Sequence, residues 1–348
     1  MELTTVWFLL IALLWTGYLV LEGFDFGVGM LLPVLGRGSD DADAETNHRV
    51  MINTIAPVWD GNEVWLLVAG GATFAAFPEW YATLFSGFYL PLLLILLALI
   101  ARGIAFEYRG KINDAGWRAR WDRAIFFGSL LPSLLWGVAF ANIVAGVPID
   151  ARHQFTGNLL TLLNPYALLG GLTTLTLFLL HGAVFVALKT DGTIRVRAQR
   201  LAARTAPVTL VVAGAFALWT QLAHGKAWTW AAVLVAAGAL VAAVAATAAA
   251  REGVAFLLTT VVIVAAVVLL FGSLFPDVMP SSTDAANSLT TANASSTPYT
   301  LKVMTWVAVG LTPFVLLYQG WTYWVFRQRI SSSHMPAASG LSPLARRT

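Results

Sequence analysis

Two pairs of acidic residues stand out because each pair lies inside a long apolar segment of the chain. Glu22 and Asp25 form the first pair, and Asp60 and Glu63 form the second. A spacing of three residues places both members of a pair on one face of a helix. An ionisable side chain within a membrane-spanning helix costs at least about 2.5 kcal/mol and is a functional candidate by default. Partly desolvated carboxyl groups exchange protons near neutral pH, so proton exchange is the chemistry that these residues indicate.

A third apolar segment ends in charged residues that extend the same pattern. It contains Arg102, Glu107 and Lys111, and Glu107 precedes Lys111 by four residues, the favourable order for a helical ion pair. Trp59, beside Asp60, has the amphipathic character of an anchor at the membrane interface. Consecutive helices with short connections tend to be neighbours, so we expect the acids of the three segments to gather at one membrane face.

A purely structural interpretation competes with proton exchange at each of these positions. Residues near helix ends reach water by extending their side chains, and an acid at a helix N-terminus favours the helix dipole. An exposed ion pair contributes only about 0.3–0.5 kcal/mol. Proton exchange is favoured for Asp25 and Asp60, which lie in segments rich in glycine and aromatic residues. The structural interpretation is favoured, taken singly, for Glu22, Glu63, Glu107 and Lys111.

The composition identifies the elements that must position these residues as membrane helices. Of the 348 residues 58% are apolar and 11% are charged, and the mean hydropathy is +0.74. A soluble domain carries about 25% charged residues. A helix needs about 20 apolar residues to cross the hydrocarbon core, and nine runs approach that length. They are Val6–Leu32, Pro57–Phe77, Tyr81–Ile104, Ala124–Ala145, Pro165–Leu188, Ala206–Leu222, Trp228–Ala249, Val254–Phe275 and Val303–Phe326.

The basic residues give an independent test of nine crossings. With the N-terminus outside, 18 of the 21 Lys and Arg residues fall in cytoplasmic segments and three in outer ones, as the positive-inside rule requires. This places the C-terminus in the cytoplasm and the acids toward the cytoplasmic face. The first run lacks a basic leader and an early cleavage site, so it is expected to be a retained helix.

The connections are too short for a second folded unit. We expect a tight hairpin at Ala223–Ala227 and a surface cap over the helix ends at Pro276–Leu301. Residues 1–330 are therefore expected to form a single membrane domain. Residues 331–348, rich in Ser, Pro and Ala, are expected to be a disordered cytoplasmic tail.

The residues needed to hold a redox cofactor are largely missing. The absence of cysteine excludes disulfides, iron–sulfur clusters and thiolate metal sites. Of the five histidines only His181 lies well inside a predicted helix, and one histidine cannot make a bis-histidine haem site. No Gly-rich phosphate loop and no HExxH zinc motif occurs. Any redox cofactors of a complex containing this chain are therefore expected mostly or wholly in a partner.

Several motifs resemble subunit II of the cytochrome bd-type quinol oxidases, and they run from the first predicted helix to the ninth. The most specific are the WDGN-type segment within Met51–Leu66 and the VMPSS-type segment within Phe275–Ser282. The others are Gly23–Met30, Phe85–Tyr89, Trp117-Arg118 with Trp121-Asp122, Gly137–Phe140, Thr156–Asn158 with Leu163–Pro165, and Val303–Ala308.

The resemblance implies a fold and a function. The fold is two four-helix bundles, about 1–146 and 164–276, plus a peripheral ninth helix at about 301–327. The implied partner is a pseudo-symmetric subunit I that carries the b and d haems and the quinol site. The complex reduces dioxygen to water in the bacterial inner membrane. Subunit II stabilises subunit I and contributes a proton path, and in some members it holds a structural quinone. Small single-helix subunits are left open.

The resemblance also assigns residues to the proton path. The family's channel acids match Asp25 and Asp60, next to Trp59. Residues at the channel mouth match Glu107, where the family pattern has aspartate, and Lys111. A basic residue near that mouth matches Arg102. No role is implied for His181.

Two other functions fit the acids without this resemblance. In a proton-coupled secondary transporter they would couple protons to a solute, although such proteins show broken helices near the midplane, whereas these acids cluster near one face. In a purely structural subunit Asp25 and Asp60 would be dispensable. The sequence does not distinguish ubiquinol from menaquinol.

Overall fold

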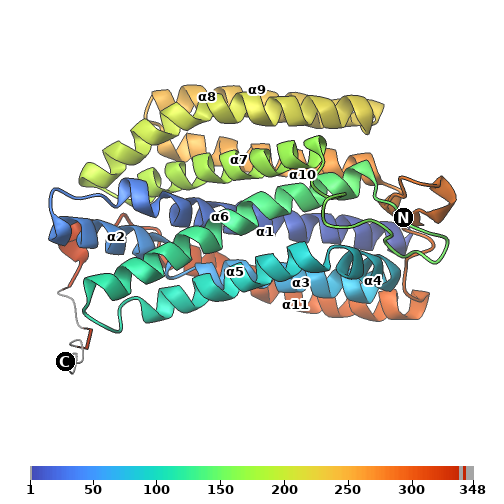
Figure 1. The fold of residues 1–348 in the computed structure, drawn as a ribbon, viewed down its shortest axis with the longest axis horizontal. Helices are drawn as coiled ribbons and strands as arrows, with labels where there is room; N and C mark the ends of the chain where they lie inside the picture. Colours follow the sequence, from blue (N-terminus) through green and yellow to red (C-terminus); the bar gives the residue numbers. More distant parts are fainter. Residues whose placement is uncertain (1, 337–339, 342–348) are drawn as a thin grey trace.

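A computed structural model describes residues 2–336, 340 and 341. Within this range the chain is helical apart from one small β-hairpin and three 3₁₀ turns (Figure 1). The α-helices are α1 (Leu3–Leu35), α2 (Asp41–Ile55), α3 (Trp59–Ala76), α4 (Pro78–Gly87), α5 (Tyr89–Tyr108), α6 (Ala115–Ala145), α7 (Pro165–Lys189), α8 (Gly192–Ala223), α9 (Trp230–Ala248), α10 (Glu252–Leu274) and α11 (Pro298–Val325).

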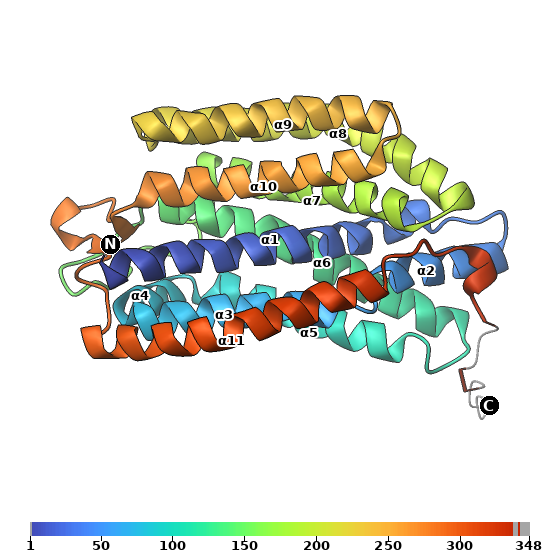
Figure 2. The same ribbon diagram turned by 180° about the vertical axis from the view of Figure 1, so that it is seen from behind.

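The long helices run side by side along the longest axis of the molecule. The start of α1 lies at the same end as the loops before α7 and before α11, whereas α2 and the end of α11 lie at the other end (Figures 1 and 2). Helices α8 and α9 form an outer layer over α7 and α10, and α11 lies on the opposite side beside α1 and α3. Proteins with this helix arrangement present their loops and helix ends at two opposite faces.

Eight helices of the described chain are long and apolar enough to cross a membrane. They correspond to all the predicted runs except Pro57–Phe77, which forms α3, where Asp60, Asn62 and Glu63 lower the mean hydropathy. The protein is therefore a multi-pass membrane protein. The ninth crossing, its orientation and the division into two bundles remain predictions.

The prediction of one continuous helix at Tyr81–Ile104 is wrong. The chain forms α4 and α5, which are separated at Phe88. Pro91 explains the position of the break, because its ring nitrogen has no proton to donate to the carbonyl of Gly87, four residues earlier. Proline is instead well placed in the first turn of a new helix.

Two helical segments outside the apolar runs begin at acidic residues. The Asp40 carboxylate accepts a hydrogen bond from the backbone N–H of Asp43 (2.8 Å) and starts α2, which was not predicted. Asp114 accepts from Trp117 N–H (2.6 Å) and starts α6 nine residues before the predicted span. Such caps satisfy the free N–H groups of the first helical turn.

Glycines let α1 approach α7 closely. Gly23 lies against the ring of Phe178, and a Cβ atom added to Gly27 would lie 2.6 Å from Gly182 Cα. No side chain fits between the two backbones at that point. This contact holds the acid-bearing part of α1 against the centre of the molecule.

The connection at Ala223–Ala227 forms a tight turn, as predicted, and the longer connection at Pro276–Leu301 forms a folded loop over helix ends. Helix α8 ends at Ala223, and a 3₁₀ turn at Ala227–Thr229 leads into α9. In the longer loop, β1 (Asp277–Met279) pairs antiparallel with β2 (Leu289–Thr290). This loop is tied to helix ends through Ser296 N–H, which donates to Ala76 O at 2.8 Å.

The described part of the segment after α11 lies along the same end as α2. Ile330 N–H donates to Lys189 O (2.8 Å), and Arg49 Nη1 donates to Pro336 O (2.7 Å). Leu341 exchanges backbone hydrogen bonds with Lys111 O (2.9 Å) and Asn113 N–H (2.8 Å). Residues 337–339 and 342–348, which the predicted disordered tail includes, lie outside the described residues, and the disorder stays a prediction.

Substitution of Gly27 by alanine is expected to destabilise the protein by about 1–3 kcal/mol, because the new methyl group would collide with the α7 backbone. Thermal unfolding of the purified complex measures this effect. Gly238→Ala on α9 is the matched control, because a Cβ atom there meets nothing within 4 Å. Equal melting temperatures of the two variants would contradict the close contact.

Candidate functional site

Asp25 is completely buried in α1 and is held by a residue of α3. The side-chain NH₂ of Asn62 donates to Asp25 Oδ2 at 2.6 Å, and Asn62 is itself buried. The other carboxylate oxygen, Oδ1, is buried and has no hydrogen-bond partner among the described residues. Asp25 is thus a carboxyl group with one oxygen engaged and one free to take a proton.

Arg102 of α5 lies inside the molecule rather than near a surface mouth. Its side chain is fully buried and forms an ion pair with Glu22, which is also fully buried. Nη1 of Arg102 also lies 3.5 Å from Oε1 of the half-buried Glu63. The guanidinium packs over the rings of Phe26 and Phe106, at 4.7 and 5.4 Å from their centroids. Three helices therefore meet around one buried cation.

Glu22 and Glu63, for which the structural interpretation was favoured, both pair with Arg102 in the same region as Asp25. The signal that identified them was their spacing of three residues from the other acids, which the ion pairs with Arg102 now support. We define the acid cluster as Glu22, Asp25, Glu63 and Arg102. Nε and Nη2 of Arg102 and Oε2 of Glu22 have no protein partner among the described residues. Buried polar atoms of this kind are usually satisfied by internal water.

The remaining predicted residues lie farther out. Trp59 is half-buried, with its ring 5.1 Å from that of Phe106, whereas Asp60, Glu107 and Lys111 are exposed on the isolated chain. No ion pair joins Glu107 to Lys111 within the described residues, because α5 ends at Tyr108 and Lys111 is no longer on a helix. The structure thus brings Asp25 and Arg102 into one buried region and leaves the other acids at its edge.

A second ionic cluster lies beside the first, outside the apolar spans, and joins α2 to the start of α6. Arg109 donates to Glu45 at 2.8 and 3.0 Å and to Asp122 at 2.5 and 3.1 Å. His48 Nδ1 lies 2.9 Å from Asp122. Burial by itself would raise the pKa of Glu45, but hydrogen bonds from Arg109 and Arg118 outweigh burial and lower it. Burial by itself would lower the pKa of Arg109, but its hydrogen bonds to Asp122 and Glu45 outweigh burial and raise it.

His181 is buried where α7 meets α1 and α10, and both of its ring nitrogens have protein partners. Nδ1 lies 2.7 Å from Thr259 Oγ1, and Nε2 lies 3.2 Å from Val20 O. The ring stacks on Phe256 with centroids 4.5 Å apart. These contacts make His181 a hydrogen-bonded structural residue with no nitrogen left to ligate a metal. No group of three His, Cys, Asp or Glu residues suited to a metal occurs in the described part of the chain.

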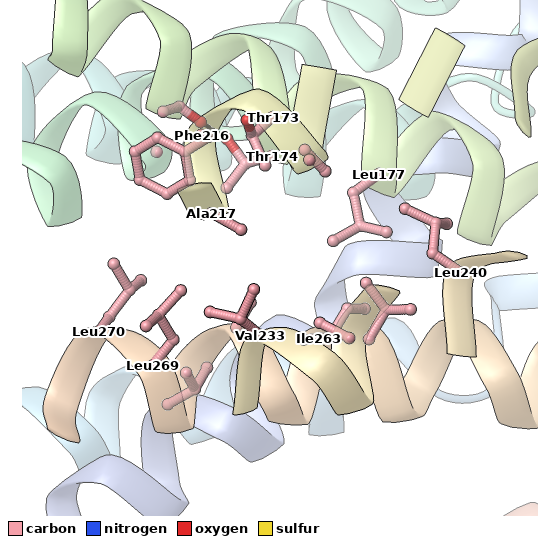
Figure 3. A pocket seen from close by; sticks show the side chains of 18 of the residues that line it. Thr173, Thr174, Leu177, Phe216, Ala217, Val233, Leu240, Ile263, Leu269 and Leu270 are labelled. Atoms are coloured by element: carbon pink, nitrogen blue, oxygen red, sulfur yellow. Dashed lines mark hydrogen bonds between the residues drawn. The ribbon is translucent and has the colours of Figure 1, made fainter. Parts of the chain in front are cut away.

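Two apolar cavities lie between the helices. One, of about 200 Å³, is enclosed by α6–α10, with Thr173, Thr174 and Phe216 facing Leu269 and Leu270 across it (Figure 3). The other, of about 480 Å³, lies among α1, α3, α4, α5 and α6 and has an aromatic lining. That lining includes Trp15, Trp80, Tyr81, Phe85, Tyr89 and Trp136. The indole N–H of Trp80 is buried and has no hydrogen-bond partner among the described residues.

Removal of the Glu45 carboxylate is expected to make stability less sensitive to acid. A carboxyl group with a lowered pKa contributes stability that is fully present above its ordinary pKa of 4.5 and is lost as the pH falls through the lowered value. The melting temperature of Glu45→Gln should therefore lie below that of the wild type near neutral pH, and the gap should close in acid. A gap that stays constant down to about pH 3 would contradict this role.

The known proteins that this chain resembles are subunits of cytochrome bd oxidases. A sequence model of the family described as cytochrome bd terminal oxidase subunit II matches residues 3–326. Cytochrome bd ubiquinol oxidase subunit 2 of Bacillus subtilis (strain 168) is 44% identical over 338 residues, covering 95% of this chain and 97% of the relative. Cytochrome bd-I ubiquinol oxidase subunit 2 of Escherichia coli (strain K12) is 37% identical over 366 residues, covering 94% of each.

The fold is also shared with a solved structure. A chain of the bd oxidase from Geobacillus thermodenitrificans superposes with a TM-score of 0.76 at 17% sequence identity, covering 94% of this chain and 98% of that one. The family match spans every helix from α1 to α11 and includes all the residues of the acid cluster. The chain belongs to the family of cytochrome bd terminal oxidase subunit II.

Proposed function

We propose that this protein stabilises the haem-bearing subunit I of a quinol:O₂ oxidoreductase and supplies it with protons from the cytoplasmic side. The observation that carries the proposal is the acid cluster, in which Glu22 and Glu63 pair with the buried Arg102 and the buried Asp25 is held by Asn62. Buried carboxyl groups beyond those that one cation can neutralise are what a proton path needs.

Charge counting explains why this cluster supports proton exchange. Three ionised carboxylates and one guanidinium would leave two uncompensated negative charges in a medium of low polarity, at a cost of several kcal/mol per ion. Retention of a proton relieves that repulsion. Arg102 prevents full neutralisation, because its pairing with Glu22 favours the carboxylate there. The cluster is thereby suited to pass between states that differ by one proton.

The exposed position of Asp60 is an argument both for the proton path and for a partner subunit that covers it. It is exposed on a face of α3 that also presents Val64, Leu67 and Phe74, which are 44%, 72% and 58% exposed. A carboxylate on such a face is costly against lipid. A polar surface of subunit I would cover it and continue the path, with Trp59 beside it. Glu107 and Lys111, exposed at the end of α5, are then the entry from the cytoplasm.

The exposed helix α11 supports the same partner surface. Only Leu301 of its residues is buried, and Trp306, Phe314 and Leu317 are about 70% exposed. Large aromatic side chains with this exposure suit a protein interface or lipid. The side of the molecule formed by α3, α5 and α11 is the side on which we place subunit I.

Within the residues that the structure describes, the one buried histidine has no nitrogen free for a haem iron, so we assign the b and d haems to the partner. Axial ligation requires a free histidine, methionine, cysteine or tyrosine side chain aimed at the iron. The one buried histidine, His181, uses both nitrogens in bonds to Thr259 and Val20. No step of the proton path in this chain passes through a haem.

A structural quinone fits the larger cavity. Its 480 Å³ and aromatic lining match a ring with an isoprenoid tail. The wider setting of the proposal is a multi-pass protein of the bacterial inner membrane, with quinol reaching the complex through the partner and with small single-helix subunits as possible additions. The rival function, a proton-coupled transporter, is not supported, because the matching relatives are oxidase subunits.

Replacement of either path acid by its amide should stop proton delivery without removing the haems. Asp25→Asn and Asp60→Asn are each expected to lower quinol-dependent oxygen uptake by about tenfold or more, because an amide cannot carry the proton. Haem content per complex, measured by absorbance, should stay at the wild-type value. Asp41→Asn, at an exposed position in α2, is the control and should keep full turnover.

The outcomes separate the three functions weighed from the sequence. Full turnover in both amide variants would mean that this subunit has a purely structural function. Loss of the haem subunit from the purified complex would show that the acids act on assembly and not on proton transfer. Purification without any haem partner would contradict the proposal altogether.

Filling the larger cavity should exclude a bound quinone. Gly70 lines it, and a Cβ atom there meets nothing within 4 Å, so Gly70→Leu would place a side chain in the open space. Solvent extraction of the purified complex followed by chromatography is expected to give at least one quinone per complex for the wild type and less for this variant. Gly238→Leu, away from the cavity, is the control. Equal quinone contents in both variants would refute the assignment.

A further inference from the structure

The peripheral helix α11 reaches the acid cluster through two polar residues. Gln319 and Tyr323 are spaced by four residues and lie half-buried on one face of a helix that is otherwise mostly exposed. Tyr323 Oη donates to Asn62 Oδ1 at 2.7 Å, and Gln319 Nε2 lies 3.4 Å from the same oxygen. Asn62 in turn donates to Asp25 Oδ2. None of these α11 contacts was expected from the sequence.

The direction of this hydrogen-bond chain is fixed by Trp65. An indole N–H can only donate, and that of Trp65 donates to Gln319 Oε1 at 2.8 Å. The Gln319 carboxamide must therefore turn its NH₂ group toward Asn62. Rotation of the Asn62 carboxamide would set N–H groups against each other. Asn62 consequently keeps its oxygen toward α11 and its NH₂ toward Asp25.

This fixed donor distinguishes the two oxygens of Asp25. Oδ2 is committed to accepting from Asn62 in either protonation state, because Asn62 cannot turn to become an acceptor. Oδ1 is buried and has no protein partner among the described residues. A proton on Asp25 therefore belongs on Oδ1.

We propose that Trp65, Gln319 and Tyr323 are positioning residues that hold Asn62 as a permanent donor to Asp25, so that Oδ1 carries the exchangeable proton. The proposal rests on the proposed function of Asp25 in the proton path. It gives α11 a role beyond the partner surface, since its seating on α1 and α3 sets the orientation of the Asn62 carboxamide.

The test is the double variant Gln319→Leu with Tyr323→Phe in the whole complex. Without the two α11 donors the Asn62 carboxamide is free to rotate, and its oxygen can then accept a bond from a protonated Asp25. A carboxyl group that loses a donor and gains an acceptor holds its proton more tightly. The pH profile of quinol-dependent oxygen uptake should therefore move by about one unit toward higher pH. Haem content and the KM for quinol should not change.

The matched control is Tyr318→Phe with Thr322→Val, on the same helix. Tyr318 is 68% exposed, and the Thr322 hydroxyl bonds only its own helix, at Tyr318 O. This pair should leave the pH profile in place. The single variant Tyr323→Phe, which removes one oxygen atom, gives a smaller shift and serves if the double variant does not assemble.

Coupling distinguishes positioning from general support. In an Asn62→Leu background the double variant should add no further shift, because the donor that it orients is gone. A further shift there, or an unchanged profile of the double variant while Asp25→Asn abolishes turnover, would overturn this inference and leave the proposed function standing. Full turnover of Asp25→Asn would overturn both.

Discussion

A positively charged side chain buried between apolar helices must be neutralised where it lies, and Arg102 imposes this requirement on three helices at once. Its guanidinium is fully enclosed, and Glu22 of α1 and Glu63 of α3 both lie against its Nη1. Loss of one partner from a buried ion pair costs about 3–5 kcal/mol, because the remaining charge has no water to solvate it. The positions of α1, α3 and α5 are therefore linked through electrostatics as well as through packing. Asp25 shares this environment without a cation of its own, which makes it the group with the most to gain from a proton.

The rest of the fold encloses this region and fixes the positions of the helices that form it. The Gly27–Gly182 contact presses α1 onto α7, and His181 joins α1 to α10 through Val20 and Thr259. On the other side, α11 covers α3 through polar contacts while most of its own surface stays open. Helices α8 and α9 are also open on their outer face, where Val211 and Leu234 are 71% and 68% exposed. Apolar side chains with this exposure suit contact with lipid.

The sequence predicted the parts of this account that depend on local pattern. Apolar length identified eight of the nine predicted spans, and the position of an acid inside an apolar run singled out Asp25 as a candidate because such residues are rare and costly. Helix α2 was not predicted because it is polar and short. Asp40 and Asp43 are nevertheless a sequence signal for a helix start, because acidic residues are typical there. The break at Phe88 depends on Pro91, a signal that uniform hydropathy concealed. The depth of Arg102 could not be predicted, since a basic residue near the end of an apolar run is equally consistent with reaching toward water. Contacts between distant segments, such as Tyr323 with Asn62, carry no sequence signal without the fold.

The central claim, that protons enter through this subunit from the cytoplasmic side, is tested most directly by proton uptake from a defined side of the membrane. The complex is reconstituted in vesicles with a pH-sensitive dye on the side of the α2 and Arg109 end, and the fully reduced oxidase is mixed rapidly with oxygen. The account predicts proton consumption on that side at the rate of turnover in the wild type, and much slower consumption in Asp25→Asn. Uptake from the opposite side, or uptake at the wild-type rate in Asp25→Asn, would contradict it.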